Sequence, residues 1–248
     1  MNCGIFVKNV NNPMNHNQKY IDAIKQAGKE GDESFFSFFN PPFKGDINQI
    51  IMKGCRDFNQ SILTPIVHKA INGYSDKTAL EIGYGGGRLM LPACHYFKFV
   101  VGIDIHEEID LVDSFLKSHK INNYDLYKTD GHTLSLEKDN SLDFIYSFVV
   151  FQHLPSFEIF ESYAREIHRC LKPNGIAQIY YGSFKRLDPE KQKKYLSQGY
   201  AEFPENPVNG VSLLVHEDKA KEMCGDFEIV DSGFTLSRKQ DYVTLVKK

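Results

Sequence analysis

The sequence predicts an α/β fold in which helices cover both faces of a mainly parallel sheet. Short apolar runs alternate with helical patterns between residues 75 and 182, which is typical of successive strand-helix-strand units. The first of these runs opens into a glycine-rich turn, and the end of the chain returns to two strand-like runs. A chain of 248 residues is long enough for one such domain with additions.

Residues 1–74 are expected to form a helical N-terminal cover, with the main domain following over 75–248. Apolar residues recur at helical spacing over 47–58 and again over 62–71. Because this segment precedes the first strand and its glycine turn, we expect it to lie over the ligand cleft.

The apolar run 78–82 contains Glu81 and leads into Gly83, Gly85 and Gly87. Glycine has no Cβ and reaches positive φ, so such a turn lets the backbone lie close to a ligand. A second apolar run ends in Asp104, about 20 residues after the first glycine, as in nucleotide-binding units where the acid accepts hydrogen bonds from ribose hydroxyls. We therefore expect a nucleotide-containing ligand at this turn.

Three kinds of glycine-rich nucleotide-binding loop can be distinguished by the residues that each requires. A P-loop requires Gly-Lys-Ser or Gly-Lys-Thr, which the sequence lacks. The dinucleotide fingerprint fits Gly83 and Gly85, but Arg88 stands at its third position, where a small residue allows close helix packing. This mismatch weakens the hypothesis of a nicotinamide cofactor, which stays open as an alternative. The loop fits best the form acid-x-Gly-x-Gly-x-Gly.

With this form the chain resembles the class I S-adenosylmethionine-dependent methyltransferases of the small-molecule type. Segments between residues 75 and 182 match that family's motifs in the expected order. They are the glycine turn after Glu81, the strand that ends in Asp104, the strand 124–131, the strand 141–154, and the helix, Lys-Pro-Asn-Gly turn and strand of 165–180.

The resemblance implies a Rossmann-like, doubly wound, seven-stranded sheet with an antiparallel terminal strand, and S-adenosyl-L-methionine as the cofactor. It implies that Glu81 positions the amino-acid portion of the cofactor, that Asp104 holds its ribose and that Asp130 contacts its adenine. The candidate cofactor-binding residues are Glu81, Gly83, Tyr84, Gly85, Gly87, Asp104, Ile105, Asp130, Gly131 and Phe148.

These three carboxylates also have plainer interpretations. Glu81 can cap a helix or pair with a cation, and Asp104 can be an exposed carboxylate at a strand end. Asp130 can form a turn before Gly131.

His153 is the candidate catalytic residue. It lies just beyond the fourth predicted strand, and ligands bind at the carboxyl ends of parallel strands. A neutral imidazole takes a proton from a hydroxyl or amine near pH 7. The alternative is a histidine that packs or hydrogen-bonds within its loop. Gln152, Tyr180 and Tyr181 are further candidates for the cleft, and His216 is expected to cap the last helix.

Two other segments invite a functional interpretation. Residues 183–214 contain Lys-rich stretches and several Pro and Gly residues, so an inserted lid is expected there. Asn40-Pro41-Pro42-Phe43 resembles the amino-group-clamping motif of DNA and protein N-methyltransferases, but in the unpermuted order that motif follows the fourth strand. A permuted arrangement and an aromatic cluster that packs the cover or lines the substrate pocket both stay open.

Composition limits the partners. A formal net charge of −3 gives no basic footprint for nucleic acid, so a small-molecule acceptor is expected. No apolar run approaches the ~20 residues that span a bilayer, and residues 1–20 lack a signal-peptide core. We expect a cytoplasmic protein with no membrane partner. The five cysteines are scattered and are expected to be reduced, and the histidine spacing predicts no metal site.

The predicted function is methyl transfer to an oxygen or nitrogen of a small metabolite or sugar by direct in-line displacement. His153 favours oxygen, because an oxygen nucleophile needs a base whereas an uncharged amine needs only desolvation. An NAD-dependent oxidoreductase and a non-catalytic module that binds S-adenosylmethionine stay open as alternatives.

Overall fold

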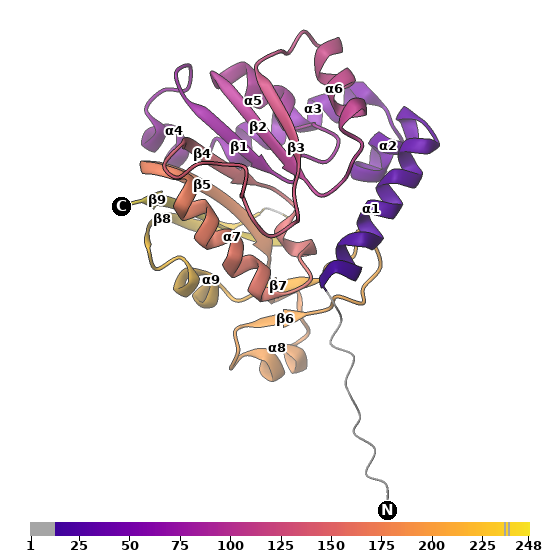
Figure 1. Ribbon diagram of the computed structural model, residues 1–248. Coiled ribbons are helices and arrows are strands. Elements are labelled where there is room, and N and C mark those ends of the chain that lie inside the picture. The colour runs from indigo at the N-terminus through magenta and orange to yellow at the C-terminus, as the bar shows by residue number, and fades with distance from the viewer. Residues whose placement is uncertain (1–12, 236, 238) are drawn as a thin grey trace, which may run out of the picture.

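A seven-stranded sheet of order β3-β2-β1-β4-β5-β9-β8 forms the centre of the computed structural model, which describes residues 13–235, 237 and 239–248 (Figure 1). Strands β1 to β5 are parallel, and β9 runs antiparallel to both β5 and β8. The Rossmann-like doubly wound sheet with an antiparallel terminal strand is thus confirmed. Its strands are β1 (Thr78–Ile82), β2 (Phe99–Asp104), β3 (Tyr124–Lys128), β4 (Leu142–Ser147), β5 (Leu171–Gly182), β8 (Phe227–Phe234) and β9 (Gln240–Lys247).

Helices lie on both faces of this sheet, because alternate strand residues point to opposite sides. Ala79 packs into an apolar layer with helices α3 to α6, and its neighbour Leu80 packs into a second layer with α7 and α9. The helices are α1 (Pro13–Lys29), α2 (Asp32–Phe39), α3 (Ile47–Asp57), α4 (Pro65–Ile71), α5 (Met90–Tyr96), α6 (Ile109–Ser118), α7 (Phe157–Cys170), α8 (Pro189–Tyr195) and α9 (Glu217–Met223), with single turns η1 (Pro41–Phe43), η2 (Phe58–Ile62), η3 (Phe151–His153) and η4 (Phe184–Arg186).

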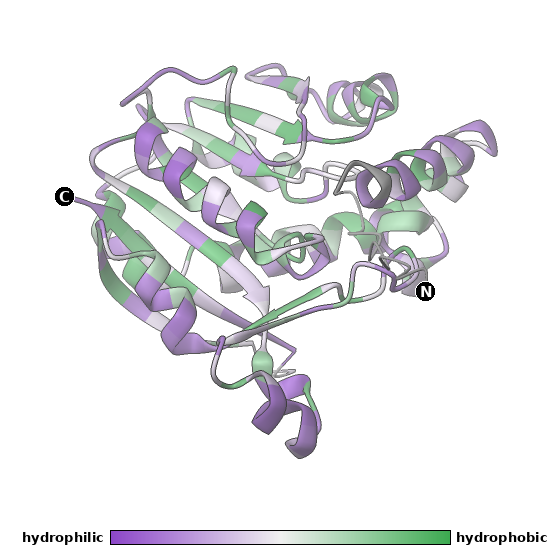
Figure 2. Ribbon diagram, turned by 60° about the horizontal axis from the view of Figure 1, so that its bottom comes forward, coloured by the Kyte–Doolittle hydropathy of each residue, from purple (hydrophilic) through white to green (hydrophobic). Residues whose placement is uncertain are grey.

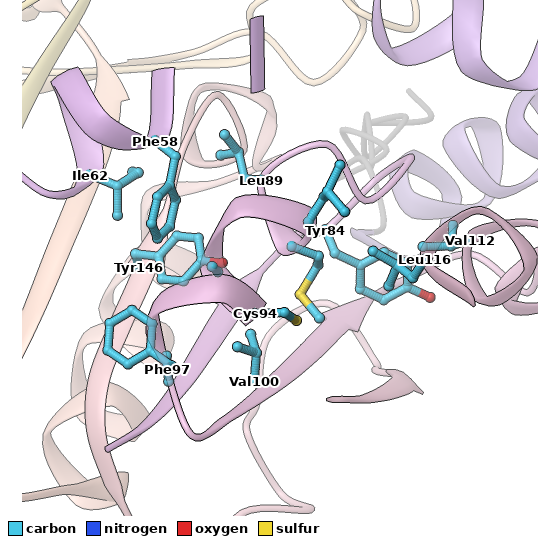
Figure 3. Close-up of a cluster of buried hydrophobic side chains, with 14 of the residues drawn as sticks. Phe58, Ile62, Tyr84, Leu89, Cys94, Phe97, Val100, Val112, Leu116 and Tyr146 are labelled. Atoms are coloured by element: carbon cyan, nitrogen blue, oxygen red, sulfur yellow. The ribbon is translucent and has the colours of Figure 1, made fainter. Parts of the chain in front are cut away.

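The first apolar layer joins the segment before β1 to the sheet. Figure 3 shows Phe58 and Ile62 of η2 beside Tyr146 of β4, and all three side chains are almost fully buried. Burying one side chain of this size stabilises a fold by ~1.5–3 kcal/mol, so this contact anchors the N-terminal segment. Asp46 begins α3 by accepting hydrogen bonds from the N–H groups of Asn48 and Gln49.

The insertion after β5 folds into η4, α8 and a separate two-stranded sheet of β6 (Tyr200–Glu202) and β7 (Leu213–Val215). Figure 2 shows that α8 is hydrophilic along its length, whereas the strands of the main sheet carry long hydrophobic stretches. The loop between β6 and β7 runs back to the start of α1 (Figure 1). The insertion and the start of the N-terminal segment therefore lie next to each other.

Two local expectations differ from the structure. Within the described chain, residues 129–141 connect β3 to β4 without a helix, so the alternation of strands and helices is interrupted there. The Lys-Pro-Asn-Gly segment does not form a separate turn but lies inside β5, where Asn174 has a φ of 64° and the pairing with β4 shifts register. An asparagine tolerates this left-handed conformation better than most residues.

Candidate functional site

A cavity of about 330 Å³ lies where β1, β2 and β4 end and α1 and α2 cover the sheet. Ligand sites in parallel sheets lie at the carboxyl ends of strands, so the position agrees with the expected cleft. Most of the predicted site residues line it, namely Glu81, Gly83, Tyr84, Gly85, Asp104, Ile105, Gly131, Phe148 and His153. Gly87, Asp130, Gln152, Tyr180 and Tyr181 are not part of its lining.

Neighbouring side chains of the protein leave no room for a Cβ at the glycines of the turn. Gly83 has a φ of 77°, and a Cβ there would collide with the side chain of Val150. A Cβ on Gly85 would lie 2.9 Å from the ring of Phe39 in α2. Gly87 faces α6 instead of the cavity, since its Cβ would lie 2.8 Å from Val112. The cover thus rests directly on the turn.

Asp104 ties the end of β2 to this turn. One carboxylate oxygen accepts a hydrogen bond from the backbone N–H of Gly85 at 2.8 Å, and the other accepts from the N–H of Ile105 at 2.7 Å. Each oxygen keeps a further lone pair for a ligand. Asp104 also lines the cavity, so its carboxylate is both held in place and able to accept hydrogen bonds from a ligand.

His106 supports the same turn from behind and was not predicted. Its ring is fully buried, with Nε2 3.1 Å from the carbonyl oxygen of Gly85 and Nδ1 3.2 Å from the backbone N–H of Glu108. Nδ1 therefore accepts and Nε2 donates, which defines a neutral imidazole. No motif marks this residue in the sequence, because Gly85 becomes its neighbour only when β2 pairs with β1.

Glu81 is a buried carboxyl group at the cavity wall. The hydroxyl of Tyr146 donates to its Oε2 at 2.9 Å. Burial raises the pKa of Glu81 to about 8, against the opposing effects of this hydrogen bond and of Arg88. The group is therefore mostly protonated at neutral pH and can both donate and accept a hydrogen bond.

Tyr84 contributes to the core more than to the cavity. Its ring lies with Val112 and Leu116 of α6, as Figure 3 shows. Its hydroxyl is buried and has no hydrogen-bond partner in the described chain.

Phe148 lines the cavity, and the guanidinium of Arg88 lies 5.7 Å from the centroid of its ring. At this distance the face of the ring attracts the positive charge of Arg88.

The carboxylate of Asp130 is engaged in its own turn. It accepts hydrogen bonds from the N–H groups of His132 and Thr133 and from the hydroxyl of Thr133. These bonds favour the turn-forming interpretation over a contact with adenine. Gly131 does line the cavity, and a Cβ there would lie 2.6 Å from the side-chain amide of Asn17 in α1.

His153 joins the cover, the strand end and the insertion. Its Nδ1 lies 2.7 Å from the carbonyl oxygen of Gly210, and its Nε2 lies 3.1 Å from the amide nitrogen of Gln152. Burial lowers the pKa of His153 to about 4, so the ring is neutral near pH 7 and Nδ1 carries the proton. The ring thus has the protonation state that a base needs, but both of its nitrogens already make hydrogen bonds within the protein.

The first helix closes the same side of the cavity. The ring nitrogens of His16 lie 3.0 Å from the carbonyl oxygen of Pro204 and 2.8 Å from that of His153. The hydroxyl of Tyr20 accepts from the N–H of Asn209 at 3.0 Å and lies 3.2 Å from Nδ1 of His153. Residues of α1 and of the insertion, remote in sequence, thereby form one polar network.

The Asn40-Pro41-Pro42 segment lines the cavity with the aromatic residues before it. Asn40 is buried, its amide nitrogen donates to the carbonyl of Phe36 at 3.3 Å, and its Oδ1 has no partner in the described chain. The aromatic residues pack the cover onto the turn, as one interpretation expected. The chain order of the strands is the unpermuted one, which removes the permuted alternative.

Val149, just beyond β4, is strained. It has a φ of 70°, which a β-branched residue adopts rarely and at a cost of ~1–3 kcal/mol. The residue lines the cavity, and strain of this kind gathers at ligand sites.

Other expectations can be compared directly with the described residues. His216 caps α9 by accepting from the N–H of Asp218, as predicted. Tyr180 donates its hydroxyl to the carbonyl of Ser61 instead of facing the cavity. Cys55, Cys94, Cys170 and Cys224 are free thiols, and Cys3 lies outside the described residues. Over the same part of the chain, no three His, Cys, Asp or Glu side chains gather as a metal site would require, and no helix combines the length and apolarity of a membrane span.

Comparison with known proteins adds a family to this geometry. Residues 80–179 match the family model of a methyltransferase domain. No curated protein matches the sequence.

Similar solved structures share the fold at low identity. Magnesium protoporphyrin IX methyltransferase from Synechocystis, solved with bound SAH, is 17% identical with a TM-score of 0.65, over 94% of this chain and 100% of that one. A SAM-dependent methyltransferase from Methanosarcina mazei is 22% identical with a TM-score of 0.56, over 74% and 97%. The [4+2]-cyclase SpnF is 16% identical with a TM-score of 0.57, over 75% and 80%.

Proposed function

Because residues 80–179 match the family model of a methyltransferase domain, we propose that the chain is a class I S-adenosylmethionine-dependent methyltransferase and that it transfers the methyl group of S-adenosyl-L-methionine to an oxygen or nitrogen of a small metabolite or sugar. The displacement is direct and in line. The carboxylate of Asp104, held against the glycine turn at the wall of a covered cavity, is the observation that carries this proposal.

The donor set of the cavity fits this cofactor. Asp104 offers lone pairs to ribose hydroxyls, and Ile105 offers an apolar surface beside it. Burial keeps Glu81 mostly protonated at neutral pH, and the ammonium group of the cofactor would favour its ionised form. We assign these residues and Gly83, Gly85, Gly131 and Phe148 to cofactor binding, and leave Asp130 and Gly87 to turn formation and packing.

The bound cofactor supplies a sulfonium-activated methyl group, so the chain must orient an acceptor and exclude water. The cover supplies the exclusion: Phe39 rests on Gly85, and Tyr20 joins the loop of the insertion through Asn209. Orientation of two reactants in a closed site contributes up to ~7–11 kcal/mol to lowering a barrier. We propose that the insertion acts as a lid, because its loop is tied to α1 through Asn209 and Tyr20.

His153 has a positioning role in this proposal. Its Nε2 lone pair accepts from the amide of Gln152, and Nδ1 donates to Gly210. Acting as a base would require the Gln152 amide to turn away. Replacement of His153 by Asn should therefore raise the KM for the acceptor and leave the pH profile of kcat unchanged, whereas a base would lose kcat more than a hundredfold.

The acceptor class follows from the shape and charge of the site. A covered cavity of about 330 Å³ suits a small molecule better than a polymer, and the net charge of −3 gives nucleic acid no attraction. The cytoplasmic location stays a prediction from the sequence.

Turnover separates the proposal from its rivals. Protein incubated with methyl-labelled S-adenosylmethionine and pools of small hydroxylated and amino compounds should form a labelled product and S-adenosylhomocysteine. Binding without any turnover would support the non-catalytic module, and the name of the cyclase SpnF shows that chemistry other than methyl transfer occurs on this fold. Binding of NAD in place of S-adenosylmethionine would support an oxidoreductase.

A further inference from the structure

One wall of the cavity carries more positive than negative charge. Lys53 of α3 and Arg88 after the glycine turn both line it. Both bind the carboxylate of Asp57, Arg88 at 2.8 Å and Lys53 through a short ion pair, and Arg56 lies 3.5 Å from the same group. A single carboxylate therefore faces three cations, and positive charge remains.

Most hydrogen-bond donors of the two cavity cations are unused. A guanidinium has five N–H donors and an ammonium has three. Within the described chain, each of the two side chains makes its hydrogen bonds to Asp57 alone. The Arg88 side chain is 13% exposed and that of Lys53 is 28% exposed, so both side chains are partly shielded from solvent.

Nearby groups do not neutralise this excess. Burial lowers the pKa of Lys53, and so does the charge of Arg88. Glu81 lies near Arg88, but burial keeps its carboxyl mostly protonated at neutral pH. An anion placed between the two cations would remove their repulsion and form charge-assisted hydrogen bonds.

An apolar surface continues from the two cations. Phe38, Pro41 and Pro42 of the cover line the same cavity, and Phe148 packs on the guanidinium of Arg88. Asn40, among these residues, has an unpartnered buried Oδ1 that accepts from a ligand N–H or O–H. Phe38, Asn40, Pro41 and Pro42 come from the cover, whereas the cofactor candidates, Phe148 among them, come mainly from the strand ends.

Building on the proposed function, we propose that Lys53 and Arg88 bind a carboxylate of the methyl acceptor, which is a small carboxylic acid with an apolar or ring-containing body. The anion lies between the ammonium and the guanidinium, and the apolar body lies against Phe38, Pro41 and Pro42. Because the amino-acid portion of the cofactor also has a carboxylate, the experiment must separate the two sources.

The first arm tests the acceptor. Protein saturated with S-adenosylhomocysteine is titrated with matched pairs of small ring-containing carboxylic acids and their neutral amides, and the thermal midpoint is recorded. Acids should raise the midpoint where amides do not, and Lys53→Met should weaken the response at least tenfold. Lys69→Met, at an exposed lysine of α4 outside the cavity, should leave it unchanged. Equal responses to acids and amides, or no response to any acid, would overturn the proposal.

The second arm tests the cofactor. S-adenosylhomocysteine and methylthioadenosine, which lacks the amino-acid portion, are titrated into the wild type and Lys53→Met. If Lys53→Met binds both compounds with the affinity of the wild type, the two cations bind the acceptor and not the cofactor. A tenfold loss for S-adenosylhomocysteine alone would assign the cations to the cofactor and overturn the acceptor assignment. Failure of the wild type to bind S-adenosylhomocysteine is a separate result that contradicts the proposed function itself.

Discussion

The carboxylate of Asp104 accepts a hydrogen bond from the backbone N–H of Gly85 over 2.8 Å, and so joins the end of β2 to the turn that follows β1. His106 holds the carbonyl of the same glycine from the other side. Both polar groups of one glycine are thereby fixed by neighbouring residues, and the turn keeps its shape without a ligand. Preorganisation of this kind reduces the cost of binding.

Gly83→Ala should destabilise the protein strongly. The substitution forces a Cβ into Val150 at a φ of 77°, and overpacking together with backbone strain costs ~2–4 kcal/mol. Chemical denaturation measures the change in the free energy of unfolding. Gly73→Ala is the matched control, because its φ of 101° brings the same kind of strain with no atom within 4 Å of the new Cβ.

The double variant Gly83→Ala, Val150→Ala identifies the contact responsible. It should recover part of the loss, since the colliding methyl groups are removed. Equal losses for Gly83→Ala and Gly73→Ala would show that the backbone conformation, and not the contact with Val150, determines the cost.

Glu81 should make the protein less stable as the pH rises from about 5 to 8. Its folded pKa of about 8 lies above the ordinary value of ~4.3, so in this range the native state binds a proton that the unfolded state has lost. Stability from this group is complete below pH ~4 and is lost up to pH 8, by at most ~1.4 kcal/mol per pH unit.

Glu81→Gln should remove this slope, since the amide is neutral at every pH and can still accept from Tyr146. Free energies of unfolding at several pH values measure it. Glu228→Gln, at an exposed position of β8, should keep the slope of the wild type. A slope that is the same in all three proteins would show that Glu81 is ionised in the native state.

Tyr20→Phe should loosen the closure of the cavity. The hydroxyl accepts from the N–H of Asn209 at 3.0 Å, and leaving that donor unsatisfied costs ~1–3 kcal/mol. Limited proteolysis should cut the loop between β6 and β7 faster in the variant. Tyr195→Phe provides the control, because that hydroxyl makes no hydrogen bond in the described chain. Equal cleavage of both variants would contradict a network that ties α1 to the insertion.

The strands and the glycine turn were predictable because their signals are local. Apolar runs, an acid at a strand end and glycines with positive φ each lie within a few residues. Asp104 was found by its spacing from Gly83, and the structure places both at the cavity. Sheet order then followed from the family resemblance.

Residues whose role depends on distant partners were harder to predict. Asp130 before Gly131 fits a turn and a ligand contact equally well, and only its hydrogen bonds to Thr133 favour the turn. Lys53 lies in an ordinary amphipathic helix, and nothing in the sequence shows that it meets Arg88 at Asp57.

Calorimetric titration with S-adenosylhomocysteine measures whether the carboxylate of Asp104 binds the cofactor. The wild type and Asp110→Asn, at an exposed carboxylate of α6, should bind it with equal affinity. Asp104→Asn keeps an oxygen for Gly85 but loses the charge, and should bind at least tenfold more weakly, which corresponds to ~1.4 kcal/mol. Equal binding by Asp104→Asn, or binding of NAD in place of S-adenosylhomocysteine, would contradict the assignment of Asp104 to the ribose of S-adenosylmethionine.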